Sequence, residues 1–313
     1  MGSTHPTTPS PLEGEGRGGG DPSKITRREM SGDLIPEIRE DQATGEIAHI
    51  YGEIRRDFAV PAVSTVYRHV ATVPGCLEWV WATLRPAVEC GDFQEAAQGL
   101  AQVVAVAPLA PLSPDALRNM GVDAAAEQAI RDVYTGYNRN NPLNILFAFA
   151  LKRLLVDGAG GGPYLPDRDG WTPPAPLADL IPMVDPEDMG PAHRALAAEI
   201  GSWGFPPDRR WIPGVYRHLA HWPDYLVEAC EALRPRLEAG DFAHAGETMI
   251  AGADAAASSL VDRLPAAGAE FNPPRAAEAE ALAAFLDSLI PKIPEMIVIC
   301  ALLAGALPSD EQA

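Results

Sequence analysis

Residues 66–71 (VYRHVA) recur as residues 215–220 (VYRHLA), 149 positions further along the chain. When 66–96 and 215–245 are compared without a gap, 15 of 31 positions are identical. Self-similarity of this density at one fixed shift is the signature of a repeated structural unit. The sequence therefore predicts a tandem duplication, with a first copy over 33–157 and a second copy over 180–308.

The segments outside the two copies carry no pattern of core residues. Residues 1–32 are rich in Gly, Pro, Ser and Thr and are predicted to be a flexible arm. Residues 158–179 are predicted to be a Gly/Pro-rich linker, and 309–313 a short tail. A unit of about 125 residues that occurs twice indicates a pseudo-dimer, because solenoid repeats run roughly 20 to 50 residues. We expect a ligand site at the seam between the copies.

The spacing of apolar residues is helical throughout both copies. Residues 77, 80, 81 and 84 are apolar at i, i+3, i+4 and i+7, and residues 226, 229, 230 and 233 repeat this spacing. Further Ala- and Leu-rich stretches without strand alternation are 96–105, 124–133, 143–155, 245–260, 276–289 and 296–307. Pro142 and Pro294 precede the last apolar stretch of each copy, a first-turn position that proline favours. We predict an all-α fold.

The charge balance excludes several partners. The 24 Lys and Arg against 43 Asp and Glu give a net charge of −19. Affinity for nucleic acids and anionic membranes comes from clustered cations, so we expect neither as a partner. Two segments are locally basic, because 55–69 and 208–218 each carry three Arg and one Asp. These segments leave room for a small anionic substrate.

Cysteine usage and apolar runs bear on location and cofactors. The four cysteines are far apart and form no CxxC pair, so we expect free thiols. The first residues do not form a secretory signal, and the longest apolar run, 297–307, falls short of the roughly 20 residues that cross a bilayer. We expect a soluble, cytoplasmic protein. Nucleotide, phosphate-loop and zinc-hydrolase motifs are missing, so no cofactor and no metal are predicted.

Arg68 and Arg217 occupy matching positions in the two basic segments. Related by a pseudo-twofold axis, they could face one cavity and hold a carboxylate or sulfate through their forked donors. The alternative is that each forms a structural ion pair, with Glu89 and Glu238, which a duplication would also preserve. Both interpretations stay open at the level of sequence.

Other residues of the repeated segments are candidates for substrate contact. His69 and His218 could act as general bases, since imidazole titrates near neutral pH, or could be hydrogen-bonded packing residues. Tyr67 and Tyr216 precede the two arginines and are predicted to contact substrate with them. Trp222 has no counterpart in the first copy and could form either a pocket wall or part of the core.

A polar cluster at 137–142 (YNRNNP) survives in one copy only, because the second copy has 292–294 (KIP) there. A difference between duplicates points to function, since the needs of folding act on both copies. The amides of Asn138 and Asn141 each supply an acceptor and two donors, enough to orient a water or a leaving group. The alternative is that Asn140 and Asn141 cap a helix that begins at Pro142.

These residues resemble the group I 2-haloacid dehalogenases, the non-stereospecific ones that act on both enantiomers. The likeness covers 60–75, 137–142, 181–185 and 222–223, and so reaches nearly the whole chain beyond the arm. The resemblance implies an all-α pseudo-dimer in which a carboxylate activates water, which then attacks the α-carbon without an ester intermediate. It also implies that an Asn places this water. By position that Asn is Asn141.

The chain departs from the family at the catalytic Asp. Counted back from Trp222, that position falls on Val215, and neither neighbour of Val215 is acidic. The nearest acid upstream is Asp208, which has Asp57 as its loose counterpart in the first copy. We therefore predict Asn141 and Asp208 as the catalytic residues.

The loss of the usual acid bears on the reaction. Water is a poor nucleophile at saturated carbon until a base removes its proton, a contribution of about 10²–10⁴-fold. We predict an enzyme that displaces an anionic leaving group, halide or sulfate, at an sp³ carbon. The nucleophile is either activated water or an internal nucleophile that closes a ring in a pathway of secondary metabolism. The alternative function is a non-catalytic subunit or anion-binding paralogue. A homodimer, or a heterodimer with a related chain, fits either interpretation.

Overall fold

The structure, a computed structural model, describes Met1 and residues 35–101, 106–166, 171–205 and 211–308. Within these residues, helices are the only regular elements. The all-α prediction is therefore confirmed. The segment predicted to be an arm lies outside the described residues except for Met1, and the tail over 309–313 lies outside them as well. The helices all belong to one unit, Ile35–Ala313.

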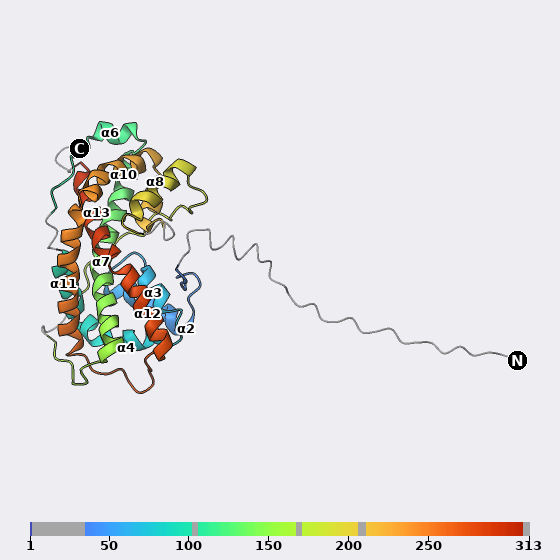
Figure 1. Cartoon of the computed structure of the whole chain (residues 1–313), viewed down its shortest axis with the longest axis vertical. Coiled ribbons are helices and arrows are strands. Elements are labelled where there is room, and N and C mark those ends of the chain that lie inside the picture. Colours follow the sequence, from blue (N-terminus) through green and yellow to red (C-terminus); the bar gives the residue numbers. More distant parts are fainter. Residues whose placement is uncertain (2–34, 102–105, 167–170, 206–210, 309–313) are drawn as a thin grey trace. The chain divides into compact units, whose positions relative to one another are not determined.

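The described helices follow one another without strands between them (Figure 1). The region predicted as the first copy holds α2 (Gly45–Asp57), α3 (Thr65–Val70), α4 (Cys76–Cys90), α5 (Asp92–Ala101), α6 (Pro114–Asn119) and α7 (Ala124–Asp157). The region predicted as the second copy holds α8 (Pro191–Gly201), α9 (Gly214–Leu219), α10 (Pro223–Glu238), α11 (Asp241–Val261), α12 (Ala276–Leu289) and α13 (Lys292–Ala306).

The buried faces of α4 and α10 lie where the apolar spacing places them. Leu77, Val80, Trp81 and Leu84 are at most 1% exposed, and the matching residues 226, 229, 230 and 233 are at most 2% exposed. Gly91 ends α4 with a φ of +89°, a left-handed conformation that glycine adopts without strain. These two helices confirm the helical interpretation of the repeated segment.

Contacts in the two predicted copies correspond at the shifts of the sequence repeat. The Arg85 guanidinium lies 2.8 Å from the Glu53 carboxylate, and Arg234 lies 2.5 Å from Glu199. The backbone N–H of residue 38 donates to the carbonyl of residue 68 at 3.0 Å, and residue 184 donates to residue 217 at 3.1 Å. Corresponding contacts are what a duplication requires. The duplication itself, the pseudo-dimer and the boundaries of the copies and of the linker stay predictions.

The prolines behave differently in the two regions. Pro294 lies in the first turn of α13, as predicted. Pro142 lies inside α7, a single helix of 34 residues, so the prediction that a new helix begins there is wrong. An interior proline lacks the N–H that would bind the carbonyl of Asn138 and costs about 3 kcal/mol or more. Burial of 141–151 against α11 and α13 offsets that cost and keeps α7 continuous.

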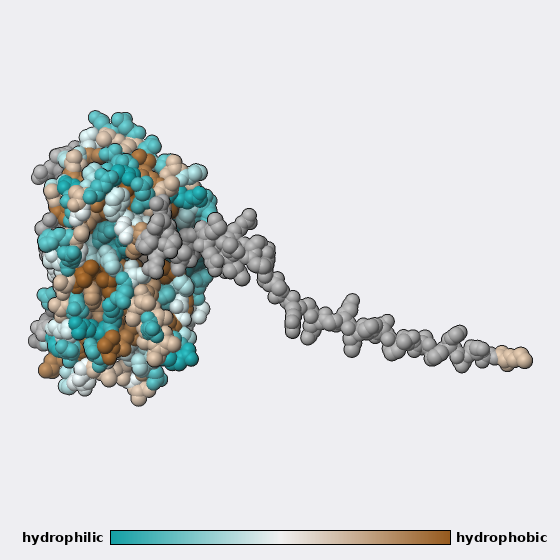
Figure 2. Space-filling view, viewed as in Figure 1, coloured by the Kyte–Doolittle hydropathy of each residue, from teal (hydrophilic) through white to brown (hydrophobic). Residues whose placement is uncertain are grey.

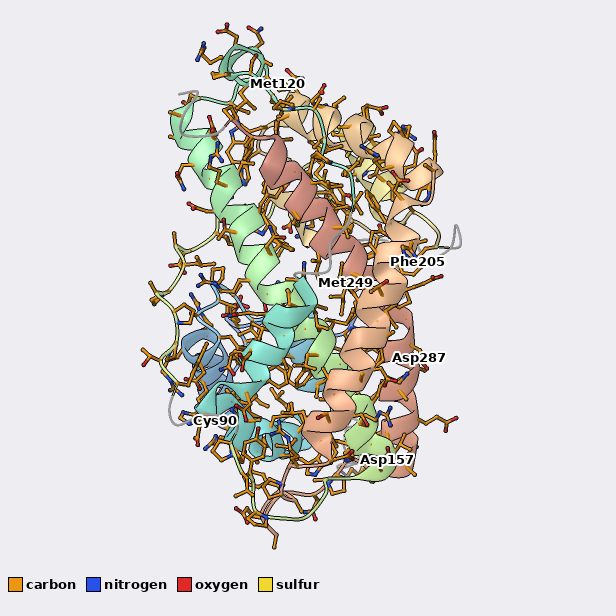
Figure 3. All side chains as sticks on the ribbon, turned by 90° about the vertical axis from the view of Figure 1, so that its left-hand side faces the viewer. Cys90, Met120, Asp157, Phe205, Met249 and Asp287 are labelled. Carbon is orange, nitrogen blue, oxygen red and sulfur yellow. The ribbon has the colours of Figure 1, made fainter. Side chains whose placement is uncertain are left out.

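The core of the fold is built around α7. Helices α11 and α13 pack along it, and Figure 1 shows α11 running beside α7. Figure 3 shows the same helices with their side chains, turned by 90°. Residues 145–148 of α7 and 297–300 of α13 are at most 2% exposed. Because α7 also contacts α5 and α9, it joins elements from both predicted copies.

One stretch within the described ranges, Ala276–Ala306, is long and apolar enough to cross a membrane by length and composition. It is longer than the apolar run noted in the sequence, because it joins α12 to α13. Of its apolar window, 67% is buried inside the fold. The face drawn in Figure 2 is largely hydrophilic with separate apolar patches. Interior packing therefore accounts for the composition of this stretch.

Candidate functional site

One face of α7 carries Tyr137 and Asn141, which the sequence singled out, together with Asn144, which it did not. Tyr137, Asn141 and Asn144 are spaced i, i+4 and i+7, which places them along one side of the helix. Asn144 donates from Nδ2 to Ser64 Oγ at 2.9 Å and to Asn141 Oδ1 at 3.4 Å. These bonds hold the Asn141 amide with its Nδ2 buried and without an acceptor among the described residues. Asn141 is 8% exposed.

The neighbouring residues tie α7 to the loop between α2 and α3. Arg139 donates to the Ala59 carbonyl at 3.0 Å, and the Asn140 side chain donates to the Ala62 carbonyl at 3.0 Å. The Asn138 carbonyl oxygen Oδ1 is buried with no hydrogen-bond partner in the described part of the chain. The capping alternative for Asn140 and Asn141 is wrong, because α7 begins at Ala124 and Asp123 caps it.

Tyr137 brings α7 against α9. Its ring centroid lies 5.9 Å from that of His218, edge to face. Gly214, the first residue of α9, makes the approach feasible, since a Cβ there would lie 2.2 Å from Tyr137 Oη. Burial raises the pKa of the Tyr137 hydroxyl, while the charges of Arg68 and Arg217 act to lower it.

Arg68 and Arg217 are ion-paired, but not with the predicted acids. Arg68 lies 3.1 Å from the Glu37 carboxylate, and Arg217 lies 2.8 Å from Asp185. The prediction of Glu89 and Glu238 as partners is wrong, because the chain segments preceding α2 and α8 run along α3 and α9 and bring nearer acids. Arg68 Nε is buried without an acceptor among the described residues. Both arginines are therefore ion-paired, and their contact with a substrate stays a prediction.

The two histidines occupy different environments. His69 Nδ1 lies 2.7 Å from the Pro36 carbonyl oxygen, and its ring lies 3.8 Å from the Phe285 ring. His218 is 5% exposed, and burial lowers its pKa to about 4, with Arg217 and His221 acting in the same direction. At neutral pH His218 is therefore uncharged. Its Nδ1 has no hydrogen-bond partner within the described ranges.

The remaining candidate residues lie in or beside the cores of the two regions. Tyr67 is fully buried with its ring 4.3 Å from Phe147. Tyr216 is fully buried beside Gly201, where a Cβ would lie 3.3 Å from its ring. Both hydroxyls lack a partner among the described residues. Trp222 lies at the start of α10, partly buried, with its ring 5.9 Å from that of His221.

Of the two candidate acids, Asp208 lies outside the described residues. Asp57 accepts two hydrogen bonds from Arg56, at 2.7 and 2.8 Å, at the end of α2. Its carboxylate is thus already hydrogen-bonded to a guanidinium group. No group of three or more metal-ligating side chains occurs in the ranges that the structure describes.

Buried polar groups are almost always hydrogen-bonded, so unpaired ones mark places where water or a ligand binds. Asn138 Oδ1, Asn141 Nδ2, Arg68 Nε and His218 Nδ1 are four such groups on α7, α3 and α9. They comprise donors and an acceptor, and one of them belongs to the Arg68 guanidinium. Groups of this kind are suited to holding a small anion or a water.

The sequence was compared with protein-family models and with curated proteins. No protein-family model matches the chain. The (R)-2-haloacid dehalogenase of Pseudomonas putida is 27% identical over 240 residues, covering 74% of this chain and 76% of that protein. The configuration-inverting 2-haloacid dehalogenase of Alcaligenes xylosoxydans xylosoxydans is 25% identical over 208 residues, covering 64% and 69%. The chain is similar to 2-haloacid dehalogenases.

The fold agrees with that similarity. A solved structure of a D-2-haloacid dehalogenase mutant in complex with D-2-CPA matches with a TM-score of 0.62 and 24% identity, over 87% of this chain and 93% of that chain. A complex of D-2-haloacid dehalogenase with L-LA matches with a TM-score of 0.62 and 23% identity over the same shares. The helical architecture of these dehalogenases is thus shared by this chain.

One acid in the described structure was missed by the sequence analysis. Glu295, in the first turn of α13, has a side chain only 14% exposed and lies 2.9 Å from the buried Lys292 ammonium. Burial raises its pKa, whereas Lys292 acts to lower it. Its Oε1 is buried without a partner among the described residues, and its charge acts on Tyr216. The available signal was the i, i+3 spacing of Lys292 and Glu295 around Pro294.

Proposed function

We propose that the chain is a dehalogenase-like enzyme that displaces an anionic leaving group, with halide favoured, from an sp³ carbon of a small acid. The observation that carries the proposal is the Asn141 amide, which is buried, fixed by Asn144 and left with a free donor. The similarity to 2-haloacid dehalogenases supplies the reaction class. The proposed substrate is a small 2-haloacid.

Each proposed role follows from the chemistry of the side chain. The Asn141 Nδ2 donates a hydrogen bond to the attacking water or to the departing halide, and so holds the reacting atoms in line. Arg68 and Arg217 stabilise the negative charge of a substrate carboxylate beside Tyr137. Because Asn141 is 8% exposed, bulk water is largely excluded, which strengthens both interactions.

The proposal includes two alternative nucleophiles, activated water or a group of the substrate itself. With activated water, we assign proton removal to Asp208. With a substrate that carries its own nucleophile, such as an amine, ring closure with loss of halide or sulfate needs only alignment and stabilisation of the anion. The group I assignment, which implies action on both enantiomers, also stays a prediction, as do a role in secondary metabolism, a cytoplasmic location and a dimeric state.

The test is release of chloride by the full-length chain from D- and L-2-chloropropionate, followed with an ion-selective electrode. We expect release from at least one enantiomer and a loss of about 10²-fold or more in Asp208→Asn. Glu295→Gln is the matched acid variant and is expected to retain the rate. If Asp208→Asn keeps the wild-type rate while Glu295→Gln loses it, the assignment of Asp208 is wrong and the base is the buried acid of α13.

A second candidate function is a non-catalytic, anion-binding subunit. Glu37 and Asp185, the described acids nearest to the two arginines, are ion-paired with them. Neither acid is therefore free to act as a general base, which favours a non-catalytic subunit. Co-purification with a related chain that carries the family's Asp, with no chloride release by this chain alone, supports the subunit. Turnover by the isolated chain rejects it.

A further inference from the structure

A cavity of about 270 Å³ lies between α2, α4 and the segment that follows α11. None of the residues of the α7 face described above lines it. Its walls include Ile50, Trp81 and Phe271, with Glu46, Glu78 and Arg85 as charged residues. The volume lies just below the roughly 300–1,000 Å³ of typical ligand pockets, which suits a small molecule.

Arg85 has an incomplete set of partners. Its Nη2 donates to Glu53 at 2.8 Å, but its Nε is buried without an acceptor among the described residues. Its counterpart Arg234 donates from Nε and Nη2 to Glu231, at 3.2 and 3.1 Å, and from Nη1 to Glu199.

The residue that matches Glu231 in the first copy is Ala82, and Ala82 lines the cavity. The first copy therefore lacks one carboxylate on this side of the guanidinium and has room for one. A ligand carboxylate would take the place that Glu231 holds beside Arg234.

Negative charge is in excess at the end of the cavity away from Arg85. Glu78 has its Oε2 buried with no hydrogen-bond donor within the described ranges, and the exposed Glu46 lies across the cavity on α2. The counterpart of Glu78 in the second copy is Val227, so the acid is not needed by the repeated fold. A carboxylate oxygen that is buried without a donor is costly, and a cation placed beside it offsets that cost.

The spacing of the charges limits the shape of the ligand. Glu78 and Arg85 lie seven residues apart on one face of α4, about 10 Å along the helix axis. An α-amino acid carries both of its charges on one carbon and cannot reach both ends. A linear ω-amino acid can, with its methylene chain along Ile50, Trp81 and Phe271. The Trp81 indole N–H already donates to Glu53 at 2.7 Å, which leaves an apolar wall.

We propose that this cavity binds a linear ω-amino carboxylate of about four to six carbons. The carboxylate meets Arg85 over Ala82, the ammonium group meets Glu78 and Glu46, and the chain lies on the apolar wall. The proposal concerns a site separate from the α7 face and does not depend on dehalogenation.

The experiment is titration calorimetry of the full-length chain with 5-aminopentanoate and with its isomer 2-aminopentanoate, which has the same atoms and charges. We expect 5-aminopentanoate to bind at least about tenfold more tightly than the isomer, and more tightly than pentanoate or pentylammonium. No binding of 5-aminopentanoate, equal binding of the isomer, or equal binding of pentylammonium overturns the proposal.

Two variants test the residues. Ala82→Glu supplies the carboxylate that Arg234 receives from Glu231, and is expected to abolish binding, whereas Ala125→Glu, at an exposed alanine of α7, leaves it unchanged. Glu78→Gln removes only the charge and is expected to weaken binding at least about tenfold. Should Ala82→Glu fail to fold by circular dichroism, Glu78→Gln decides. Unchanged affinity in Glu78→Gln overturns the assignment.

Discussion

The contact between α7 and α9 depends on the absence of a side chain at position 214. In Gly214→Ala the new Cβ lies 2.2 Å from Tyr137 Oη and 3.0 Å from Met183 Sδ, so Tyr137 has to move. Overpacking of this kind costs about 1–3 kcal/mol, against a gain of up to about 1 kcal/mol from replacing glycine in a helix. We expect a net loss in the free energy of unfolding of about 1–2 kcal/mol.

The double variant separates this collision from other effects. Tyr137→Phe removes the hydroxyl that the new methyl group meets, so the second substitution is expected to recover most of the loss caused by the first. The assay is urea unfolding of the wild type, both single variants and the pair, read as a double-mutant cycle. A neutral Gly214→Ala, or a double variant whose loss is the sum of the two single losses, refutes the proposed contact between α7 and α9.

Two further predictions concern buried titratable groups. Lys292→Met leaves Glu295 without its ion-pair partner, and is expected to cost about 3–5 kcal/mol at neutral pH, whereas Lys292→Met/Glu295→Leu recovers much of it. Burial raises the folded-state pKa of Glu295 while Lys292 acts to lower it, so loss of Lys292 raises that pKa further. The stability of the single variant relative to wild type is therefore expected to fall as pH rises above the wild-type pKa of Glu295 and the carboxyl group of the wild type ionises. Unfolding curves at several pH values check this, and a difference that does not change with pH contradicts it. Burial raises the pKa of the Cys76 and Cys230 thiols to about 12, so both are expected to stay unreactive towards a thiol reagent at pH 8 until the chain unfolds. Mass spectrometry of the labelled native chain tests this, and rapid labelling of either residue would show that its burial is wrong.

Much of the fold could be predicted because its signals are local. The i, i+3, i+4, i+7 spacing in α4 and α10 and the first-turn position of Pro294 depend on neighbouring residues alone. Pro142 misled the sequence analysis because its effect is set by tertiary packing. Helix α7 continues through it where α11 and α13 cover the helix, and neither is close in sequence.

The site could be predicted only in part. The difference between the copies drew attention to 137–142, where Asn138 and Asn141 carry buried polar atoms without a partner among the described residues, and their contact with substrate stays a prediction. The two matching arginines are both ion-paired. Their partners could not be found from sequence, because Glu37 and Asp185 reach them through segments that fold back along α3 and α9. Glu295 was missed because a single Lys–Glu pair at i, i+3 is typical of exposed helix faces, and only the structure buries it.

We infer that the buried amide of Asn141 belongs to the centre of a displacement reaction. Its most direct test is the rate of chloride release from 2-chloropropionate by wild type, Asn141→Ala and Asn119→Ala, the last at an exposed asparagine at the end of α6. We expect chloride release to fall by about 10²-fold or more in Asn141→Ala and to be unchanged in Asn119→Ala. Equal release by wild type and Asn141→Ala would contradict it.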